Sequence, residues 1–168
     1  MAKTYRAVEV SAPGTLRVVE RTIPEPGAGQ VRIRVEACGI CHTDAATVTG
    51  IYPGLKLPRV PGHEVVGRID ALGSGVSKWK IGQRVGVGLI AGEDGVCESC
   101  RRGDTVNCQN PVSSGVTTDG GYAEMGEMSA RRTDKPARKA RGGATTMRGR
   151  SPLSSAHETE LPTRTNTH

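Results

Sequence analysis

Residues 30–38 show the clearest alternation of apolar and polar side chains in the chain. Val31, Ile33, Val35 and Ala37 occupy one set of alternate positions, while arginine and glutamate occupy the other set. Successive side chains of a β-strand point to opposite faces of the sheet. The pattern therefore predicts a strand with one buried face, and its apolar side chains are expected to belong to the core.

Shorter apolar runs predict further strands. Residues 5–10 and 15–20 flank the sequence Ser-Ala-Pro-Gly, which predicts a hairpin with a four-residue loop. Two more strands are expected near 63–72 and 84–90. Several short strands separated by turn residues are typical of a small, partly open β-barrel, so the fold class is expected to be mainly β.

The segments between these strands predict little regular structure. A helical turn is expected at 43–48, with Thr43 or Asp44 as its N-cap, because short polar side chains accept hydrogen bonds from the first free backbone N–H groups. Six Gly and Pro residues lie in 50–62, which predicts a loop, and the Gly- and Cys-rich stretch 92–110 has no period. No G-x-G-x-x-G sequence follows a predicted strand, so no Rossmann unit is expected in these 168 residues.

Composition divides the chain after Glu124. Residues 1–124 carry 14 basic and 13 acidic side chains, whereas residues 125–168 carry 9 basic and 4 acidic ones. The second segment also lacks Val, Ile, Cys and aromatic residues. Such a segment buries too little apolar surface to offset its ordering entropy. We therefore expect a folded domain of residues 1–124 and a disordered basic tail of residues 125–168.

The net charge of +6 accordingly belongs mostly to the tail. The basic run 131–141 contains no aromatic residue for base stacking, which favours a solvated tail over a nucleic-acid-binding segment. The chain contains no apolar run of about 18 residues, and its N-terminus has no apolar segment of the signal-peptide type. We therefore expect a cytoplasmic location and no membrane partner.

The first group of potential metal ligands is Cys38, Cys41 and His63. Thiolate and imidazole are good zinc ligands, and carboxylates beside them can orient the imidazole. On local residues alone, an ordinary buried cysteine and a hydrogen-bonded histidine explain Cys41 and His63 equally well. The strand pattern does not decide which way the Cys38 side chain points, because the register can break at the end of the strand.

The second group has the spacing Asp94-x2-Cys97-x2-Cys100-x7-Cys108. Three cysteines within twelve residues of a loop favour a metal over a disulfide in a chain without secretory features. Structural zinc takes four ligands, and Asp94 supplies an oxygen at the same three-residue step. A cysteine-rich loop without metal remains the alternative, because a carboxylate is an uncommon structural ligand.

These motifs together resemble one known family. Residues 38–44, Cys-Gly-Ile-Cys-His-Thr-Asp, resemble the catalytic-zinc segment of the zinc-dependent medium-chain alcohol dehydrogenases, and residues 62–76 reproduce that family's Gly-His-Glu zinc signature. Residues 97–108 resemble three of the four positions of its structural-zinc lobe, and residues 119–124 resemble the strand that follows. The resemblance covers residues 5–124 and implies the GroES-like catalytic domain, a twisted, partly open β-barrel with a zinc-binding lobe.

The resemblance implies a role for each matched residue. Cys41 and His63 would bind a catalytic zinc; Asp94, Cys97, Cys100 and Cys108 would bind a structural zinc; Thr43 would relay the alcohol proton; Asp44 would hydrogen-bond the imidazole of His63; Glu64 would lie behind the metal as a transient ligand; and His42 would lie near the cofactor phosphates. The implied reaction interconverts a small alcohol and an aldehyde, with NAD or NADP as the hydride carrier. A homo-oligomer is compatible with the sequence, which gives no evidence for one.

Several positions depart from the family pattern. Asp94 stands where the family usually has Cys, Ala46 stands where many members have a relay His, and no Cys follows Cys108 to serve as the third catalytic ligand. His157 and His168 are weak substitutes, since both lie in the expected tail. The resemblance stops soon after Glu124, as in a truncated or frame-shifted product, so we expect the isolated chain to be inactive. A non-catalytic zinc-binding module is the alternative.

Overall fold

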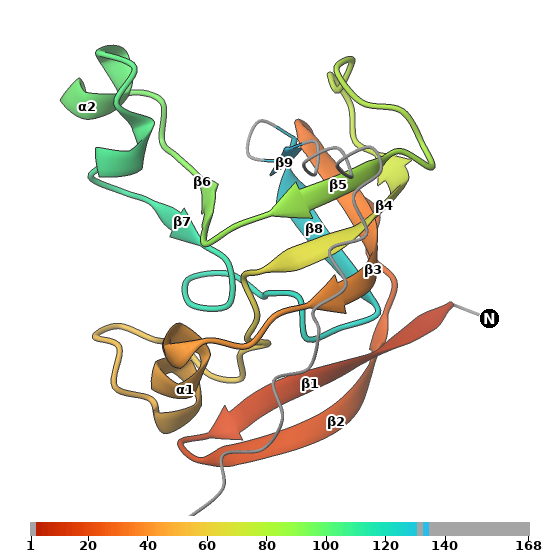
Figure 1. Cartoon of the computed structure of the whole chain (residues 1–168), viewed down its shortest axis with the longest axis vertical. Helices are drawn as coiled ribbons and strands as arrows, with labels where there is room; N and C mark the ends of the chain where they lie inside the picture. The colour runs from red at the N-terminus through yellow and green to blue at the C-terminus, as the bar shows by residue number, and fades with distance from the viewer. Residues whose placement is uncertain (1–2, 131–132, 135–168) are drawn as a thin grey trace, which may run out of the picture. The chain divides into compact units, whose positions relative to one another are not determined.

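The computed structural model describes residues 3–130 and 133–134, which lie within a compact unit of residues 1–137 (Figure 1). In chain order, its elements are β1 (Thr4–Ala12), β2 (Thr15–Thr22), β3 (Gln30–Cys38), α1 (His42–Thr49), β4 (Val65–Leu72), β5 (Arg84–Val87), β6 (Ile90–Gly92), α2 (Glu98–Arg101), a 3₁₀ turn η1 (Thr105–Asn107), β7 (Val112–Ser113), β8 (Met125–Ser129) and β9 (Thr133–Asp134). The expected mainly β architecture is confirmed. Within the described residues, no helix has the length and apolar character needed to cross a membrane.

The predicted hairpin is present as the antiparallel pair β1–β2. Ala12 pairs with Thr15, so the loop consists of Pro13 and Gly14 alone rather than the four residues expected. Gly14 has a φ of 75°, a left-handed conformation that is cheap for glycine and costly for other residues. This conformation lets the chain reverse in two residues, which leaves the two residues before the turn in β1.

The central sheet has the strand order β8-β3-β4-β5-β9 (Figure 1). β3 spans the predicted residues 30–38, and Val31 and Ile33 are fully buried as its alternation predicts. The alternation does not continue to the end of the strand, because the register with β4 shifts between Val35 and Ala37. This irregularity turns Ala37 to the surface.

Pairing between distant segments builds the core around this sheet. The buried cluster consists of Val31, Ile33, Val65, Ile69, Trp79, Val85, Val87, Met128 and Ala130. The indole Nε1 of Trp79 donates a hydrogen bond to the carbonyl of Ala130 at 2.8 Å. Four β-strands and the loop that carries Trp79 therefore contribute to one apolar core.

The sequence boundary after Glu124 lies too early. Residues 125–129 form β8, which pairs with β3, and Met125 and Met128 are both buried. The segment has low intrinsic strand propensity, and pairing with β3 overrides it. The strand expected at 119–124 is instead mostly irregular, and its only β-pairing with β1 in the described residues is one bridge between Ala123 and Ala7. The expected disorder of the tail from residue 135 onward lies outside the described residues.

Two other predicted segments differ in detail. The strand expected at 84–90 divides at Gly88, so that β5 stays in the central sheet while β6 pairs with β7. The excursion at 92–110 holds only the short α2 and η1. The predicted helical turn is α1, and Cys41 caps it in place of Thr43 or Asp44, because its thiol accepts a hydrogen bond from the backbone N–H of Thr43 at 3.3 Å.

Candidate metal centres

The lobe formed by residues 94–108 brings four potential ligands together. One ligand atom from each of Asp94, Cys97, Cys100 and Cys108 lies within 4.8 Å of all the others. Three sulfur atoms and one oxygen form a donor set that suits zinc, which accepts four ligands in a tetrahedral arrangement. The four residues that the sequence singles out by spacing are therefore close enough to share one cation.

Backbone N–H groups of the lobe point at the sulfur atoms. The N–H of Cys100 donates to Sγ of Cys97 at 3.5 Å, and the N–H groups of Asp94 and Asn110 donate to Sγ of Cys108 at 3.4 Å each. Hydrogen bonds to sulfur favour the thiolate form over the thiol. The loop is thus arranged around negatively charged sulfur, the form that binds a metal.

Asp94 is held firmly in this cluster. Its Oδ1 accepts hydrogen bonds from the backbone N–H groups of Val96 and Cys97, both at 3.0 Å, and its Oδ2 accepts one from Nδ2 of Asn110 at 2.8 Å. These bonds hold the pKa of Asp94 well below its ordinary value, and the bond from Asn110 has the largest effect. The carboxylate is therefore charged, and Oδ2 keeps a lone pair for a cation.

Without a cation, the cluster opposes the ionisation of one of its thiols. Loss of surrounding water raises the pKa of Cys100 to about 12, and the neighbouring Cys97 and Cys108 add to the rise. The backbone N–H groups of Gln109 and Cys100 lower the pKa of Cys97. Three thiolates and a carboxylate in so small a volume require a positive charge among them, so the donor set fits a divalent metal.

The second centre joins the start of α1 to the loop before β4. Sγ of Cys41 lies 2.9 Å from Nε2 of His63, and His63 is almost completely buried. Cys41, Asp44 and His63 each place a ligand atom within 4.8 Å of the other two. We call this trio the candidate catalytic centre. It contains two of the strong zinc ligands expected from the sequence, and a carboxylate close to both.

Asp44 links the two segments that carry these ligands. Its Oδ2 accepts from the backbone N–H of Cys41, and its Oδ1 accepts from the backbone N–H of Gly62, both at 2.9 Å. The same Oδ1 lies 3.3 Å from Nδ1 of His63. The carboxylate thus faces the side of the imidazole away from Cys41, which leaves Nε2 directed at the thiol.

The other residues singled out by the sequence surround this centre at greater distance. Glu64 is exposed and lies over Gly39, whose backbone N–H donates to its carbonyl at 3.0 Å, and its carboxylate is outside the trio. His42 is exposed at the first position of α1, and Thr43 is half-buried beside it. The thiol of Cys38 packs against the core and is also outside the trio.

Two residues that pack against the loop before His63 were not predicted from the sequence. The ring of Tyr122 packs on Gly62, and the Tyr122 backbone N–H donates to the carbonyl of Pro61 at 3.0 Å. Asp119 anchors the same loop by accepting from the backbone N–H of Val60 at 3.0 Å. The paired glycines between these two residues are the only local sign of such close packing, since the contacts join segments about sixty residues apart.

Gly62 is expected to tolerate no side chain. It has a φ of 102°, and a Cβ atom there would lie 2.7 Å from the Tyr122 ring and 2.8 Å from Sγ of Cys38. Gly62→Ala should lower the free energy of unfolding by about 3 kcal/mol through backbone strain and overpacking. Gly54→Ala is the matched control, because Gly54 has a φ of 77° and open space around it, and it should cost only about 1 kcal/mol. Equal losses in urea denaturation would contradict this account.

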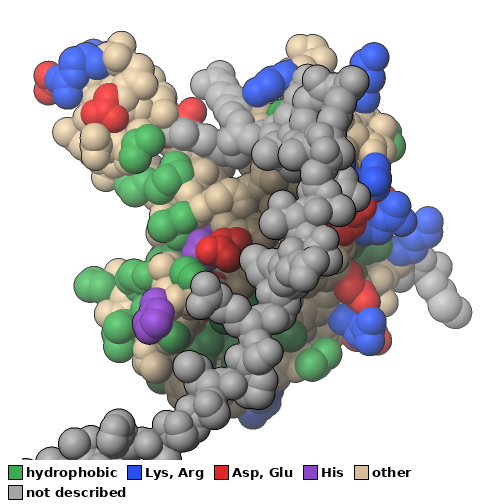
Figure 2. Space-filling model, in the orientation of Figure 1, with side chains coloured by type: hydrophobic (Ala, Val, Ile, Leu, Met, Phe, Trp, Pro, Cys, Tyr) green, Lys and Arg blue, Asp and Glu red, His purple; other side chains and the backbone are tan. Residues whose placement is uncertain are grey.

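Hydrophobic and charged side chains gather on different parts of the face in Figure 2. Hydrophobic side chains lie over the side of α1, β6 and β7, and charged side chains lie mostly over the side of the central sheet, with a second group at the outer end of the lobe around α2. The exposed apolar residues include Ile40, Ile51 and Val96, which are 82%, 71% and 64% exposed. Ile40 directly precedes Cys41, so the candidate catalytic centre borders on apolar surface.

Known proteins share both the sequence and the fold. The model of the alcohol dehydrogenase GroES-like domain matches residues 27–135. The alcohol dehydrogenase patD of Aspergillus clavatus is 46% identical over 122 residues, which are 72% of this chain and 31% of patD. The starvation-sensing protein RspB of Escherichia coli K12 is 39% identical over 126 residues, which are 75% of this chain and 37% of RspB. The chain thus spans about a third of the length of these curated relatives.

Solved structures agree with these matches. The cobalt- and zinc-bound thermostable alcohol dehydrogenase of Pyrobaculum aerophilum matches with a TM-score of 0.75 and 32% identity, over 82% of this chain and 43% of that one. The rspB dehydrogenase of E. coli CFT073, complexed with NADH, matches with a TM-score of 0.72 and 36% identity, over 79% of this chain and 38% of that one. The chain therefore belongs to the alcohol dehydrogenase GroES-like domain family, as the sequence motifs predict.

Proposed function

We propose that this chain supplies the metal-binding catalytic domain of a zinc-dependent, NAD(P)-linked alcohol dehydrogenase that interconverts a small alcohol and an aldehyde in the cytoplasm. The observation that carries the proposal is the 2.9 Å approach of Cys41 Sγ to His63 Nε2, with Asp44 on the opposite side of the imidazole. A thiol and an imidazole are two of the three protein ligands that a catalytic zinc normally has, and a carboxylate behind the imidazole is the usual support of such a histidine ligand.

Cys41 and His63 would hold the metal in this centre. Zinc at that position would lower the pKa of a bound alcohol or polarise a carbonyl group. Asp44, whose Oδ1 lies 3.3 Å from Nδ1 of His63, would orient the imidazole so that the Nε2 lone pair stays available. The backbone N–H of Thr43 donates a hydrogen bond to Sγ of Cys41. We assign the hydroxyl of Thr43 to accept the alcohol proton and pass it on.

Two further assignments rest on position alone. The exposed carboxylate of Glu64 follows His63 directly and is proposed as a transient ligand. The exposed His42, at the N-terminus of α1, is proposed to contact the phosphates of the nicotinamide cofactor. NAD and NADP are the candidate cofactors because the rspB relative is complexed with NADH and the Sinorhizobium meliloti relative is bound to NADP.

The lobe is proposed to hold a second, structural zinc through Asp94, Cys97, Cys100 and Cys108. Its ligand atoms leave no open position for a substrate, because four donors complete the coordination that zinc prefers. The function of this site is to hold residues 94–108 in one conformation. Reduced thiols are needed for it, which agrees with the proposed cytoplasmic location.

A polypeptide of these 168 residues is expected to show no alcohol-dependent reduction of NAD or NADP. A catalytic zinc normally has three protein ligands, and the described residues bring only Cys41 and His63 into strong ligand positions. Hydride transfer also requires a nicotinamide held against the substrate, and no strand–turn–helix unit of the dinucleotide-binding kind occurs among the described residues. The assay is absorbance at 340 nm with zinc-loaded chain. Sustained turnover would contradict the expectation.

The proposed function itself is tested by joining residues 1–130 to the C-terminal portion of a homologous alcohol dehydrogenase. The junction follows β8, because that strand belongs to the central sheet of this domain. We expect the chimera to oxidise small alcohols. A chimera that folds and binds zinc in the lobe but never turns over would favour the alternative, a non-catalytic zinc-binding module.

A further inference from the structure

The hydroxyl group of Tyr122 is buried and has no hydrogen-bond partner among the described residues. Buried hydroxyl groups in native proteins are almost always satisfied, so a partner is to be sought close by. The ring of Tyr122 packs against Gly62, whose backbone N–H donates to Oδ1 of Asp44 at 2.9 Å, so the carboxylate is the nearby acceptor to consider. Burial raises the pKa of Tyr122, and the charge of the Asp44 carboxylate raises it further, in agreement with this placement. Nδ1 of His63 is a second buried atom without a hydrogen bond, and it lies 3.3 Å from Oδ1 of Asp44.

The carboxylate of Asp44 has room for both of these donors. A carboxylate accepts about four hydrogen bonds. The backbone N–H groups of Cys41 and Gly62 occupy one position on each oxygen of Asp44, both at 2.9 Å. Two positions remain, and the buried donors that lack partners near Asp44 are also two, Nδ1–H of His63 and O–H of Tyr122.

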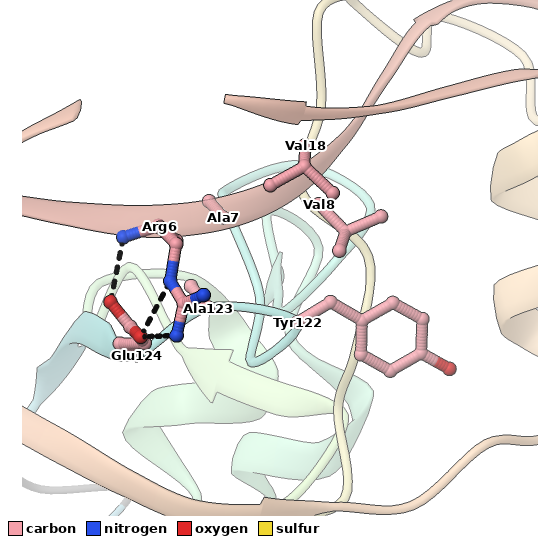
Figure 3. A pocket seen from close by; sticks show the side chains of 7 residues that line it. All are labelled: Arg6, Ala7, Val8, Val18, Tyr122, Ala123 and Glu124. Atoms are coloured by element: carbon pink, nitrogen blue, oxygen red, sulfur yellow. Dashed lines mark hydrogen bonds and ion pairs between the residues drawn. The ribbon is translucent and has the colours of Figure 1, made fainter. Parts of the chain in front are cut away.

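The rest of the Tyr122 side chain also bears on His63. Its ring lies against Gly62, the residue before His63, so closely that no Cβ atom fits between them. Figure 3 shows the ring extending away from the Arg6–Glu124 ion pair, with its hydroxyl at the far end. The near end lines a surface hollow of about 320 Å³. The ring thus lies between a surface hollow and Gly62, the residue that precedes His63 of the candidate catalytic centre.

We propose that Tyr122 is a positioning residue of the candidate catalytic centre. Its hydroxyl donates to Asp44, its ring supports the backbone of Gly62 and His63, and together these contacts keep Nε2 of His63 directed at Cys41. The proposal rests on the function proposed above, because it assigns Tyr122 to the same centre. Tyr122 touches no reacting atom in this account and acts through Asp44 and His63.

Cobalt binding to the full chain tests the proposal. One equivalent of Zn²⁺ is added first to fill the lobe, and Co²⁺ is then titrated while the thiolate-to-cobalt absorption band is recorded. Loss of the band in Cys41→Ser assigns it to the candidate catalytic centre. Tyr122→Phe, which removes only the hydroxyl, should raise the Co²⁺ dissociation constant roughly tenfold, the usual effect of losing a group that supports a ligand. Tyr52→Phe, which removes the hydroxyl of another half-buried tyrosine, should leave it unchanged.

A double-mutant cycle separates positioning from a general loss of structure. Asp44→Asn should weaken Co²⁺ binding, and adding Tyr122→Phe to it should produce no further loss, because the hydroxyl acts through the carboxylate. In the metal-free chain, NMR should show exchange of the His63 Nδ1–H with solvent about tenfold faster in Tyr122→Phe than in Tyr52→Phe. Additive effects in the cycle, or equal exchange in both variants, would overturn the proposal.

The two proposals fail in different ways. A wild-type chain that binds no Co²⁺ at Cys41 would overturn the function proposed for the centre. The exchange rate of the His63 Nδ1–H would still decide whether Tyr122 positions the Asp44–His63 pair.

Discussion

Chelation of zinc from the lobe is expected to lower the melting temperature of the domain by roughly 10 °C. A metal that binds only the native state at a thousand times its dissociation constant adds about 4 kcal/mol of stability. For a domain of this size, each kcal/mol corresponds to roughly 3 °C. The lobe contains only one short helix, one 3₁₀ turn and no residue of the main core cluster, so little besides the metal holds it in place.

Two variants connect this effect to the ligands. Cys100→Ser should reproduce most of the loss, since it removes one of three thiolates, and chelation should then change its melting temperature little. Asp94→Asn keeps the shape of the side chain and its hydrogen-bond acceptor but removes the charge, so its loss should be smaller. Ser99→Ala, at the position next to Cys100, is the control and should melt like the wild type. An unchanged melting temperature on chelation of zinc-loaded chain would contradict the assignment.

Cys41→Ala in the chimera is expected to lower turnover by a factor of at least about a thousand. The proposed metal contributes several kcal/mol of transition-state stabilisation, and about 4 kcal/mol corresponds to that factor. Alanine removes one of the two strong ligands of the candidate catalytic centre without adding bulk. The measurement is the rate of NAD(P)H formation per folded molecule, with lobe zinc confirmed in each sample.

Two threonines of α1 provide a matched pair in the same chimera. Thr43→Ala should lower turnover by about a hundredfold, the lower end of what positioned proton transfer contributes. Thr49→Ala, at the exposed end of the same helix, should leave turnover unchanged. Equal rates in Thr43→Ala and Thr49→Ala would remove Thr43 from the proton relay, and a chimera indifferent to Cys41→Ala would refute the centre.

Local sequence patterns predicted the parts of the fold that local chemistry determines. The alternation in residues 30–38 predicted β3 because one of its faces is buried, and Ser-Ala-Pro-Gly predicted the hairpin because glycine supplies the positive φ of the turn. The spacing of Asp94 and the three cysteines predicted a group that the structure brings together. In each case the residues that form the feature lie within about twenty positions of one another.

Features that depend on distant pairing escaped prediction. β8 is a strand because residues 125–129 pair with β3, nearly a hundred residues earlier, and its own Met-Gly-Glu-Met-Ser sequence gives no strand pattern. The thiol of Cys41 both caps α1 and lies beside His63, and the second of these contacts joins segments about twenty residues apart. The packing of the Tyr122 ring against Gly62 depends on loops that meet only in the folded domain. Long-range contacts of this kind leave little trace in a single sequence.

The zinc content of the purified chain tests the central claim most directly. We propose that this GroES-like domain has one complete metal site in the lobe and an incomplete one at Cys41 and His63. We predict one tightly bound zinc per chain after dialysis, retained in Cys41→Ser and lost in Cys100→Ser. A wild-type chain without tightly bound zinc, or a zinc content that falls in Cys41→Ser and persists in Cys100→Ser, would contradict the account.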